Sequence, residues 1–356
     1  MKHSRAMMAG LIAVLSLVVP GAALAAMPGE DLAPVLASKM EAAEWYTPDE
    51  AIAVRFSLEN RGDRSVWVLR YQVPSDEIDA NLFEITRNGQ PVEYVGPVVK
   101  RAEPISEDYF EIRAGARFSI VFDPSAVYDM TEQGDYSVSY RPTFLNVRTQ
   151  APADGVTAVP TTRAKVAGSE TIRLWFEGLD QHPIVEAPEV IGGYTKCTTS
   201  QQSSMQTAHN NAISISNKSK QHLAANPNGS SLYTYWFGTY TSSRFSTVVS
   251  HFNSINDAFV NKSVVYNCGC KKNYYAYVYP SQPYKIYVCR AFWSAPNLGR
   301  DSRAGTLVHE MSHFYVTAST DDWVYGATGA HNLAVSNPTN AVDNADNHEY
   351  FSEDQP

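Results

Sequence analysis

The motif His-Glu-Met-Ser-His at positions 309–313 constrains this chain more than any other feature of its sequence. Residues i and i+4 share one face of an α-helix, so a helix here would direct the imidazoles of His309 and His313 at one metal ion. Glu310 would lie beside that ion, where it could take a proton from a water whose pKa the metal lowers to about 7. The spacing therefore predicts a helical zinc centre with hydrolytic chemistry.

The residues around the motif indicate that this helix is buried. We expect it to run from about Arg303 to Thr317, with Leu307, Val308 and Phe314 on an apolar face. Histidines on a buried helix need partners, whereas two histidines on an exposed helix surface do not. The apolar face therefore favours a metal site over a pair of surface histidines.

The residues after the second histidine distinguish between the known sets of zinc ligands. Val316 and Ser319 stand where a metzincin has Gly and His. The glutamate of a thermolysin-like site is not matched either, because the next glutamates lie far along the chain. Asp322 can complete a site of two histidines and one carboxylate and leave a fourth position open for water. Asp321 is its obvious rival.

These residues resemble the deuterolysin, or aspzincin, metalloendopeptidases, and most closely their peptidyl-Lys-specific branch. The resemblance spans roughly residues 193–356. It rests on the Gly-Thr-Leu-Val-His-Glu-x-x-His stretch at 305–313, on the Asp-x-x-Tyr-Gly element at 322–326, and on the tail at 344–351. One departure is Ser319, where the family signature has glycine. The departure affects a turn and leaves every chemical position filled.

The resemblance implies a role for each residue of the site. His309, His313 and Asp322 would bind one Zn²⁺ per chain, and Glu310 would act as general base and then as general acid. Tyr325 would donate a hydrogen bond to the oxyanion that forms as water attacks the scissile carbonyl. Ordinary aromatic packing is the alternative for Tyr325, since the chain has 21 tyrosines.

Two acidic residues of the tail predict a preference among substrates. Asp346 and Glu349 stand where the Lys-specific enzymes carry the acids that recognise the substrate's ammonium group. Two carboxylates in a narrow pocket favour the compact Lys head group over the forked Arg. We therefore expect cleavage of Xaa-Lys bonds in protein and peptide substrates, with lysine at P1′. The alternative is that both acids belong to a solvated C-terminal turn.

All four cysteines lie in the C-terminal half of the chain. An even count in an exported chain favours disulfides over free thiols. Cys268 and Cys270 are separated by one residue and do not pair easily with each other. Two disulfide pairings therefore remain, each of which joins these two cysteines to Cys197 and Cys289. The resemblance implies one of them, Cys197–Cys268 with Cys270–Cys289.

The N-terminus has the pattern of a secretory signal peptide at residues 1–25. Basic residues are followed by an apolar run to Val19 and by the small residues before a cleavage site at Ala25. Pro20 and Gly21 interrupt the run that a membrane anchor would need. We expect a secreted protein with no membrane contact after cleavage, and a monomer by default. A formal net charge of −9 argues against nucleic-acid binding.

The pattern of apolar and polar residues changes along the chain and predicts an α+β protein with two parts. Residues 51–142 alternate apolar and polar positions in short runs, with a hairpin turn at Arg87-Asn88-Gly89, and predict a β-sandwich. We expect it to form a β-rich prodomain that spans residues 26–177. A loop is expected at 151–160 and a processing linker at 178–193. Residues 194–356 predict a mainly helical catalytic domain with a small β-hairpin. Its expected helices span 200–225 and 244–259, and its strands 274–279 and 284–289.

The β-rich part is expected to keep a protease latent as an intramolecular inhibitor. Lys100 lies at 98–102 between predicted strands, where a loop could present it to the acidic pocket as a substrate mimic. An exposed basic turn is the alternative, because lysines are mostly solvated.

Two other functions use the same residues. One is an exported, non-catalytic binding or adhesion protein in which zinc is structural. The other is an amidase acting on cell-wall peptides. An intact Glu310 and an open fourth metal position favour a secreted zinc endopeptidase made as a latent precursor.

Overall fold

The computed structural model describes residues 32–75, 77–141, 144–151, 162–167, 171–179 and 192–355. The predicted signal peptide, nearly all of the predicted loop at 151–160 and most of the predicted linker lie outside the described residues.

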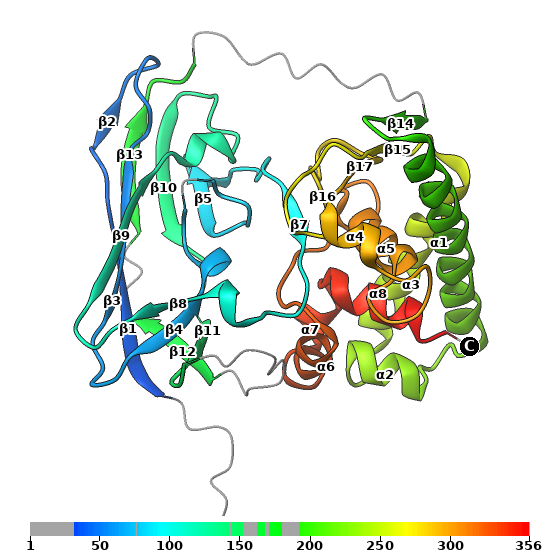
Figure 1. Ribbon diagram of the computed structural model, residues 1–356. Coiled ribbons are helices and arrows are strands. Elements are labelled where there is room, and N and C mark those ends of the chain that lie inside the picture. The colour runs from blue at the N-terminus through cyan, green and yellow to red at the C-terminus, as the bar shows by residue number, and fades with distance from the viewer. Residues whose placement is uncertain are drawn as a thin grey trace, which may run out of the picture. The chain divides into compact units, whose positions relative to one another are not determined.

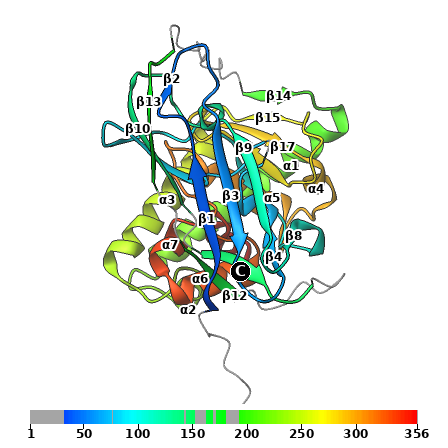
Figure 2. The ribbon, with the colours of Figure 1, turned by 90° about the vertical axis from the view of Figure 1, so that its left-hand side faces the viewer.

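The N-terminal half contains two β-sheets within its described residues, and the larger has seven strands (Figure 1). Figure 2 shows three of them, β1, β3 and β9, side by side. Every second residue of β3 is buried, as expected for a strand with one face on a core. In sheet order the strands are β8 (Tyr109–Ile112), β4 (Val66–Leu69), β11 (Phe144–Arg148), β12 (Thr162–Ala167), β1 (Leu32–Glu41), β3 (Val54–Asn60) and β9 (Arg117–Phe122).

The second sheet has five strands and contains the predicted hairpin. Asn88 and Gly89 connect β5 and β6 with φ angles of 48° and 80°, the left-handed backbone of a two-residue hairpin turn. In sheet order its strands are β2 (Trp45–Tyr46), β13 (Ile172–Phe176), β10 (Gly134–Tyr140), β5 (Phe83–Arg87) and β6 (Gln90–Pro91).

Side chains from both sheets form one hydrophobic core. Phe56 and Val68 come from the first sheet, Ile85, Val138 and Leu174 from the second, and all five are buried. The N-terminal half therefore has a core of its own, made of residues on alternating strand positions.

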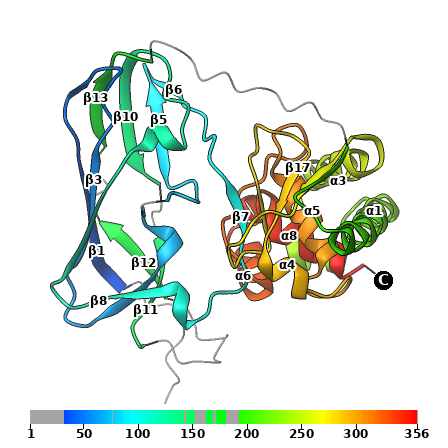
Figure 3. The same ribbon diagram turned by 45° about the horizontal axis from the view of Figure 1, so that its top comes forward.

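The C-terminal half is mainly helical, so the chain is an α+β protein, as predicted. The predicted helices at 200–225 and 244–259 are confirmed as α1 and α3. The C-terminal half has a hydrophobic core of its own, on which α1 and α3 pack together with α5 and α8 (Figure 3). The helices are α1 (Thr199–Ala225), α2 (Ser231–Phe237), α3 (Ser242–Asn261), α4 (Arg290–Ser294), α5 (Arg303–His313), α6 (Ala327–Ser336), α7 (Pro338–Val342) and α8 (Ala345–Glu353).

A third sheet joins strands from the two halves. Its order is β14 (Gly193–Thr195), β15 (Val265–Asn267), β17 (Lys285–Val288), β16 (Ala276–Val278) and β7 (Val98–Lys100). The predicted hairpin is confirmed in β16 and β17, which pair antiparallel.

The segment around Lys100 differs from its prediction. We predicted a loop, but Val98–Lys100 forms β7, which lies beside β16 (Figure 1) and pairs antiparallel with it. The pairing brings Lys100 opposite Ala276. The edge of a sheet presents unpaired backbone groups that readily take up another strand. The exposed basic turn is also wrong, because Lys100 is fully buried.

Both disulfides have the pairing implied by the resemblance, Cys197–Cys268 and Cys270–Cys289. The first joins the segment before α1 to the end of β15, and the second joins the segment before β16 to the start of α4. Both therefore tie helices to the third sheet.

The motif helix α5 ends earlier than predicted. It stops at His313, and Phe314 already has an extended backbone. Thr317 donates its hydroxyl to the carbonyls of Met311 and Phe314, and the Thr320 N–H donates to the Ser312 carbonyl. These bonds satisfy the carbonyls of the last turn and turn the chain back toward the helix. Among the described helices, none has both the length and the apolar character needed to cross a bilayer.

Candidate active site

The helix α5 is held rigidly at its N-terminus and along its length. Ser302 caps it, because its Oγ accepts the Gly305 N–H at 2.9 Å. Every residue from Ala304 to His313 is buried. Of its polar side chains, His309 faces Asp346 and Glu349 of α8, and Ser312 and His313 face Thr320 in the segment after α5.

Two histidines and one carboxylate meet beside this helix. Asp322 Oδ1 lies 3.3 Å from His309 Nε2 and 3.5 Å from His313 Nε2. Ligand atoms about 2.0–2.1 Å from a tetrahedral zinc are about 3.4 Å from one another. The two distances therefore have the size that a shared zinc ion requires.

The other ring nitrogen of each histidine has an acceptor beside it. His313 Nδ1 is 2.8 Å from the Thr320 carbonyl oxygen, and His309 Nδ1 is 2.8 Å from Asp346 Oδ1. A proton on Nδ1 leaves Nε2 free as a lone-pair donor. Thr320 thus orients the His313 ring by a hydrogen bond, and the Asp346 carboxylate lies beside the His309 ring as a charge partner.

The rival carboxylate, Asp321, is turned elsewhere. Its Oδ2 pairs with Arg141 Nη1 at 2.8 Å, and its Oδ1 accepts the Asp322 N–H at 2.9 Å. The geometry therefore brings Asp322, rather than Asp321, to the histidines.

These three side chains fit a zinc ion. His309 Nε2, His313 Nε2 and Asp322 Oδ1 are buried, lie within 4.8 Å of one another and have no hydrogen-bond partner among the described residues. Unsatisfied buried polar atoms are costly, and a cation would satisfy all three at once. Two imidazoles and a carboxylate are also the donor types that zinc prefers.

Glu310 lies next to the histidines in a dry environment. Its side chain is fully buried, and both carboxylate oxygens lack a hydrogen-bond partner among the described residues. Burial raises the pKa of Glu310 well above its usual range, while the charge of His309 opposes this effect. A carboxylate with raised proton affinity is suited to accept and return a proton.

Tyr325 also reaches this cluster. Its hydroxyl donates to Asp322 Oδ2 at 3.0 Å, and the Tyr71 ring packs edge-on against its ring at 5.4 Å. Burial raises the pKa of Tyr325 well above its usual range, so the phenol keeps its proton as a donor. Tyr325 thus packs against Tyr71 and also forms a hydrogen bond to Asp322. Ordinary aromatic packing, the alternative for this residue, does not account for that hydrogen bond.

The acidic residues of the tail form a buried pocket around Lys100. Lys100 Nζ is 3.1 Å from Asp346 Oδ1 and 2.6 Å from Glu349 Oε2, and all three side chains are fully buried. Burial lowers the pKa of Lys100, but the two carboxylates outweigh it and raise this pKa well above its usual value. The solvated turn is therefore wrong for both acids, which face a cation inside the protein.

Two aromatic residues that the sequence analysis did not select also face this ammonium group. The rings of Tyr275 and Tyr350 lie 5.6 and 5.4 Å from Lys100 Nζ, within the range of cation–π attraction. Among 21 tyrosines no sequence signal separates these two, because their position depends on how β16 and α8 pack.

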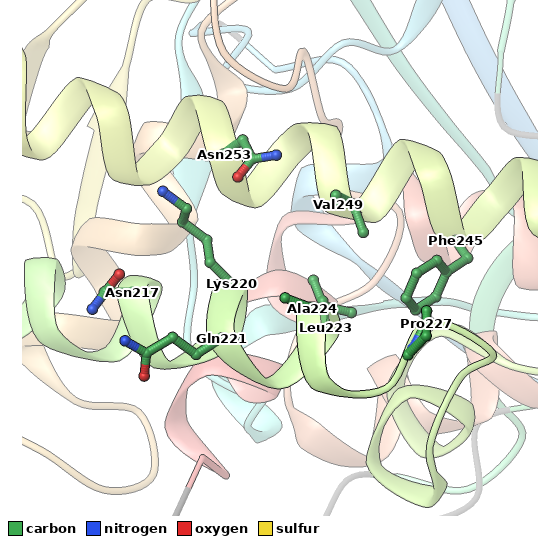
Figure 4. A pocket seen from close by; sticks show the side chains of 9 residues that line it. All are labelled: Asn217, Lys220, Gln221, Leu223, Ala224, Pro227, Phe245, Val249 and Asn253. Carbon is green, nitrogen blue, oxygen red and sulfur yellow. The ribbon is translucent and has the colours of Figure 1, made fainter.

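A groove between α1 and α3 lies apart from these residues (Figure 4). Its volume is about 430 Å³, with Leu223, Phe245 and Val249 among its apolar side chains and Lys220 and Asn253 among its polar ones. The candidate catalytic residues do not line it. The candidate active site is therefore not this groove but the cluster of polar atoms around α5, where β7 fills the acidic pocket.

Two histidines and a glutamate on a buried helix, with a carboxylate from the segment after it, are the arrangement of a zinc metallopeptidase. A family model described as lysine-specific metallo-endopeptidase matches residues 222–353. An extracellular protease of Aeromonas hydrophila is 40% identical over 344 residues, which cover 91% of this chain and 96% of that protein. A peptidyl-Lys metalloendopeptidase of Grifola frondosa is 32% identical over 97% of this chain and 98% of its own length.

A peptidyl-Lys metalloendopeptidase of Pleurotus ostreatus is 43% identical over 164 residues, which are 46% of this chain and 97% of that protein. The chain belongs to the lysine-specific metallo-endopeptidase family and is a zinc metalloendopeptidase. The resemblance described from the sequence is thereby confirmed.

Proposed function

We propose that this chain is the latent precursor of a secreted endopeptidase that cleaves peptide bonds on the amino side of lysine. The observation that carries the proposal is the ammonium group of Lys100, buried between Asp346 and Glu349. The pocket opens beside His309, because Asp346 Oδ1 lies within 3.1 Å of both His309 Nδ1 and Lys100 Nζ. A lysine side chain held here places its backbone next to the reacting groups.

The pocket chemistry supports lysine over other side chains. Two buried carboxylates without a cation would repel each other and remain desolvated, so a neutral side chain is disfavoured. The ammonium group is compact, whereas the planar guanidinium of arginine needs a broader site. Two aromatic rings near the Nζ atom add attraction for a cation.

The catalytic roles follow from the positions of the side chains. His309, His313 and Asp322 would hold one zinc ion, which supplies Lewis acidity that lowers the pKa of water and polarises a carbonyl. Glu310 accepts the proton of the attacking water and then gives it to the leaving amine. Tyr325 donates its hydroxyl to the oxyanion, a contact whose removal typically costs about 3 kcal/mol.

Latency is proposed to come from residues 26–177 acting as the prodomain, a β-sandwich built from the two N-terminal sheets. Its strand β7 adds to the edge of β16, and the Lys100 carbonyl accepts the Tyr275 N–H at 3.2 Å. The neighbouring Arg101 guanidinium lies 4.7 Å from the rings of both Tyr71 and Tyr274. A substrate can take this place only when β7 leaves.

Export and maturation complete the proposal. Residues 1–25 would direct secretion, in line with the Aeromonas relative that is named an extracellular protease. Cleavage in the linker at 178–193 would release a catalytic domain of residues 194–356. The Pleurotus relative, which matches 46% of this chain with nearly its whole length, is consistent with a mature enzyme of about this size.

The test is hydrolysis of matched peptides by the zinc-loaded chain after removal of its N-terminal half. Peptides that differ only in Lys, Arg or Ala at P1′ should be cleaved fastest when lysine is present. Activity on casein should vanish with a chelator and fall by at least about 100-fold in Glu310→Gln, because general-base catalysis contributes about 10²–10⁴. Equal turnover of the three peptides would reject the lysine pocket, and casein hydrolysis that survives both treatments would reject the zinc mechanism.

A further inference from the structure

A third carboxylate, that of Asp301, faces the ammonium group of Lys100. Asp301 Oδ1 lies 3.9 Å from Lys100 Nζ, farther away than the carboxylates of Asp346 and Glu349. The side chain of Asp301 is 38% exposed, whereas those two are fully buried. Asp301 is therefore the acid of the pocket that remains in contact with water.

The side chain and backbone of Asp301 are both held by α8. Tyr350 donates its hydroxyl to Asp301 Oδ1 at 2.8 Å, and the Asp301 N–H donates to Glu353 Oε2 at 3.1 Å. The other Glu353 oxygen, Oε1, accepts the N–H and the hydroxyl of Ser302, each at 2.8 Å. The helix that carries Glu349 thus also places Asp301.

Two backbone features are needed for this arrangement. Asp301 has a φ of 50°, a left-handed conformation that is uncommon outside glycine. Gly305 lets Glu353 approach α5, because a Cβ at Gly305 would lie 2.0 Å from Glu353 Oε1 and 3.0 Å from Glu349 Cγ. A strained residue kept in place by several hydrogen bonds is the pattern expected of a functional position.

We propose that Asp301 is a third, specificity-determining acid of the lysine pocket and that Glu353 positions it. The inference rests on the proposed lysine preference and extends it. Asp301 contacts water and can attract an incoming ammonium group, which the buried pair then receives. A partly exposed charge about 4 Å away contributes modestly, so its removal should cost about 3- to 10-fold in kcat/KM on lysine substrates.

Asp301→Asn is the sharpest variant for the test. Asparagine keeps the acceptor for Tyr350 and tolerates a positive φ, so the substitution removes charge with little change of shape. The chain is expressed in full, freed of its N-terminal half and loaded with zinc. Its kcat/KM is then measured on peptides with lysine or the uncharged norleucine at P1′. We expect a fall for lysine and no change for norleucine.

The matched control is Asp257→Asn, which removes the same charge from an exposed residue of α3 that pairs with Lys262 and is not part of the acidic pocket. Glu353→Gln should lower the lysine-to-norleucine ratio, and it should lower it no further when combined with Asp301→Asn. If the native enzyme does not distinguish lysine from norleucine, the proposed function itself is wrong. If it does, and Asp301→Asn leaves the ratio unchanged or lowers both rates equally, the inference is overturned.

A second measurement does not depend on activity. In the intact chain, Asp301→Asn should lower Tm while Lys100 is present, because a favourable charge pair is lost. In the Lys100→Met background the same change should leave Tm unchanged or raise it, because three acids then repel one another. Equal downward shifts in both backgrounds would show that Asp301 does not respond to the ammonium group, and would overturn the inference.

Discussion

Ser319 is a non-glycine residue with a left-handed backbone in a turn of this site. Its backbone has a φ of 54°, in the left-handed region that favours glycine. It lies in the turn that carries the chain from the end of α5 to Asp322, and its N–H donates to the Phe314 carbonyl at 3.2 Å. The turn is therefore made here with a serine under strain.

Ser319→Gly should stabilise the protein. A non-glycine residue in the left-handed region costs about 1–2 kcal/mol, and the extra freedom of glycine in the unfolded chain offsets about half of this. We expect a gain of about 0.5–1 kcal/mol, seen as a rise in Tm of about 2–4 °C for a domain of this size. Ser319→Val should lower Tm, since a β-branched residue tolerates this φ poorly. A lower Tm for the glycine variant would show that the turn is not strained.

The strand β7 is the element through which the N-terminal half contacts the acidic pocket. Three residues pair with β16, and one of them inserts a buried cation into the acidic pocket. Backbone pairing gives β7 its position, and the side chain of Lys100 gives the contact its chemical specificity. An exposed loop would have provided neither the backbone pairing nor the buried contact of Lys100.

Lys100→Met should release latency in the intact chain. The substitution keeps a long apolar side chain but leaves Asp346 and Glu349 without a cation, and breaking a buried pair in this way costs about 3–5 kcal/mol. We expect the unprocessed variant to cleave a lysine peptide at least about 100-fold faster than the unprocessed native chain. The control is Lys39→Met, which removes an exposed lysine of β1 that pairs with Glu41 of the same strand, β1. If the unprocessed Lys100→Met variant is as inactive as the unprocessed native chain, Lys100 is not the inhibitory contact.

At the scale of the whole molecule, the two halves have separate hydrophobic cores, and the metal site belongs to one of them. The N-terminal core is built from two sheets, and the C-terminal core from helices and the third sheet. The three candidate ligands all lie on or next to α5, inside the C-terminal core. Metal binding should therefore stabilise the two halves unequally.

Removal of zinc should lower the melting temperature of the helical half. A ligand that binds only the native state at about 1,000 times its Kd contributes about 4 kcal/mol, or roughly 10 °C for a domain of this size. Circular dichroism at a helix band reports on this half, because the long helices of the described chain lie there. Added zinc should restore the transition. Chelation should have no effect on His313→Ala, and an unchanged native Tm after chelation would contradict a zinc site on α5.

Much of the site could be predicted because its determinants are local. The spacing of His309 and His313 predicts a shared ligand face on any helix, and the helix α5 forms from the predicted start, Arg303, although it ends at His313. The alternation of apolar residues predicted the strands and the asparagine-glycine hairpin, and both follow from short-range backbone geometry. The mainly helical C-terminal half was predicted on the same basis.

Other features depended on contacts between distant segments. Asp321 and Asp322 are adjacent and chemically identical, and their own spacing does not distinguish them: in the folded chain Asp321 pairs with Arg141, while Asp322 lies 3.3 Å from His309. Lys100 was assigned to a loop because the strand that pairs with it lies in the other half of the chain. No local pattern records such a partner.

The sequence by itself determined the chemistry available to this protein. It contains two histidines and a glutamate at helical spacing, a carboxylate shortly after them, and two acids in the tail. Only the tertiary structure decided how these groups are used: Lys100 and Asp346 are 246 residues apart in the chain but 3.1 Å apart in space. Local spacing is set by the covalent backbone, whereas the occupant of a buried pocket is set by the packing of segments that meet only in the folded chain.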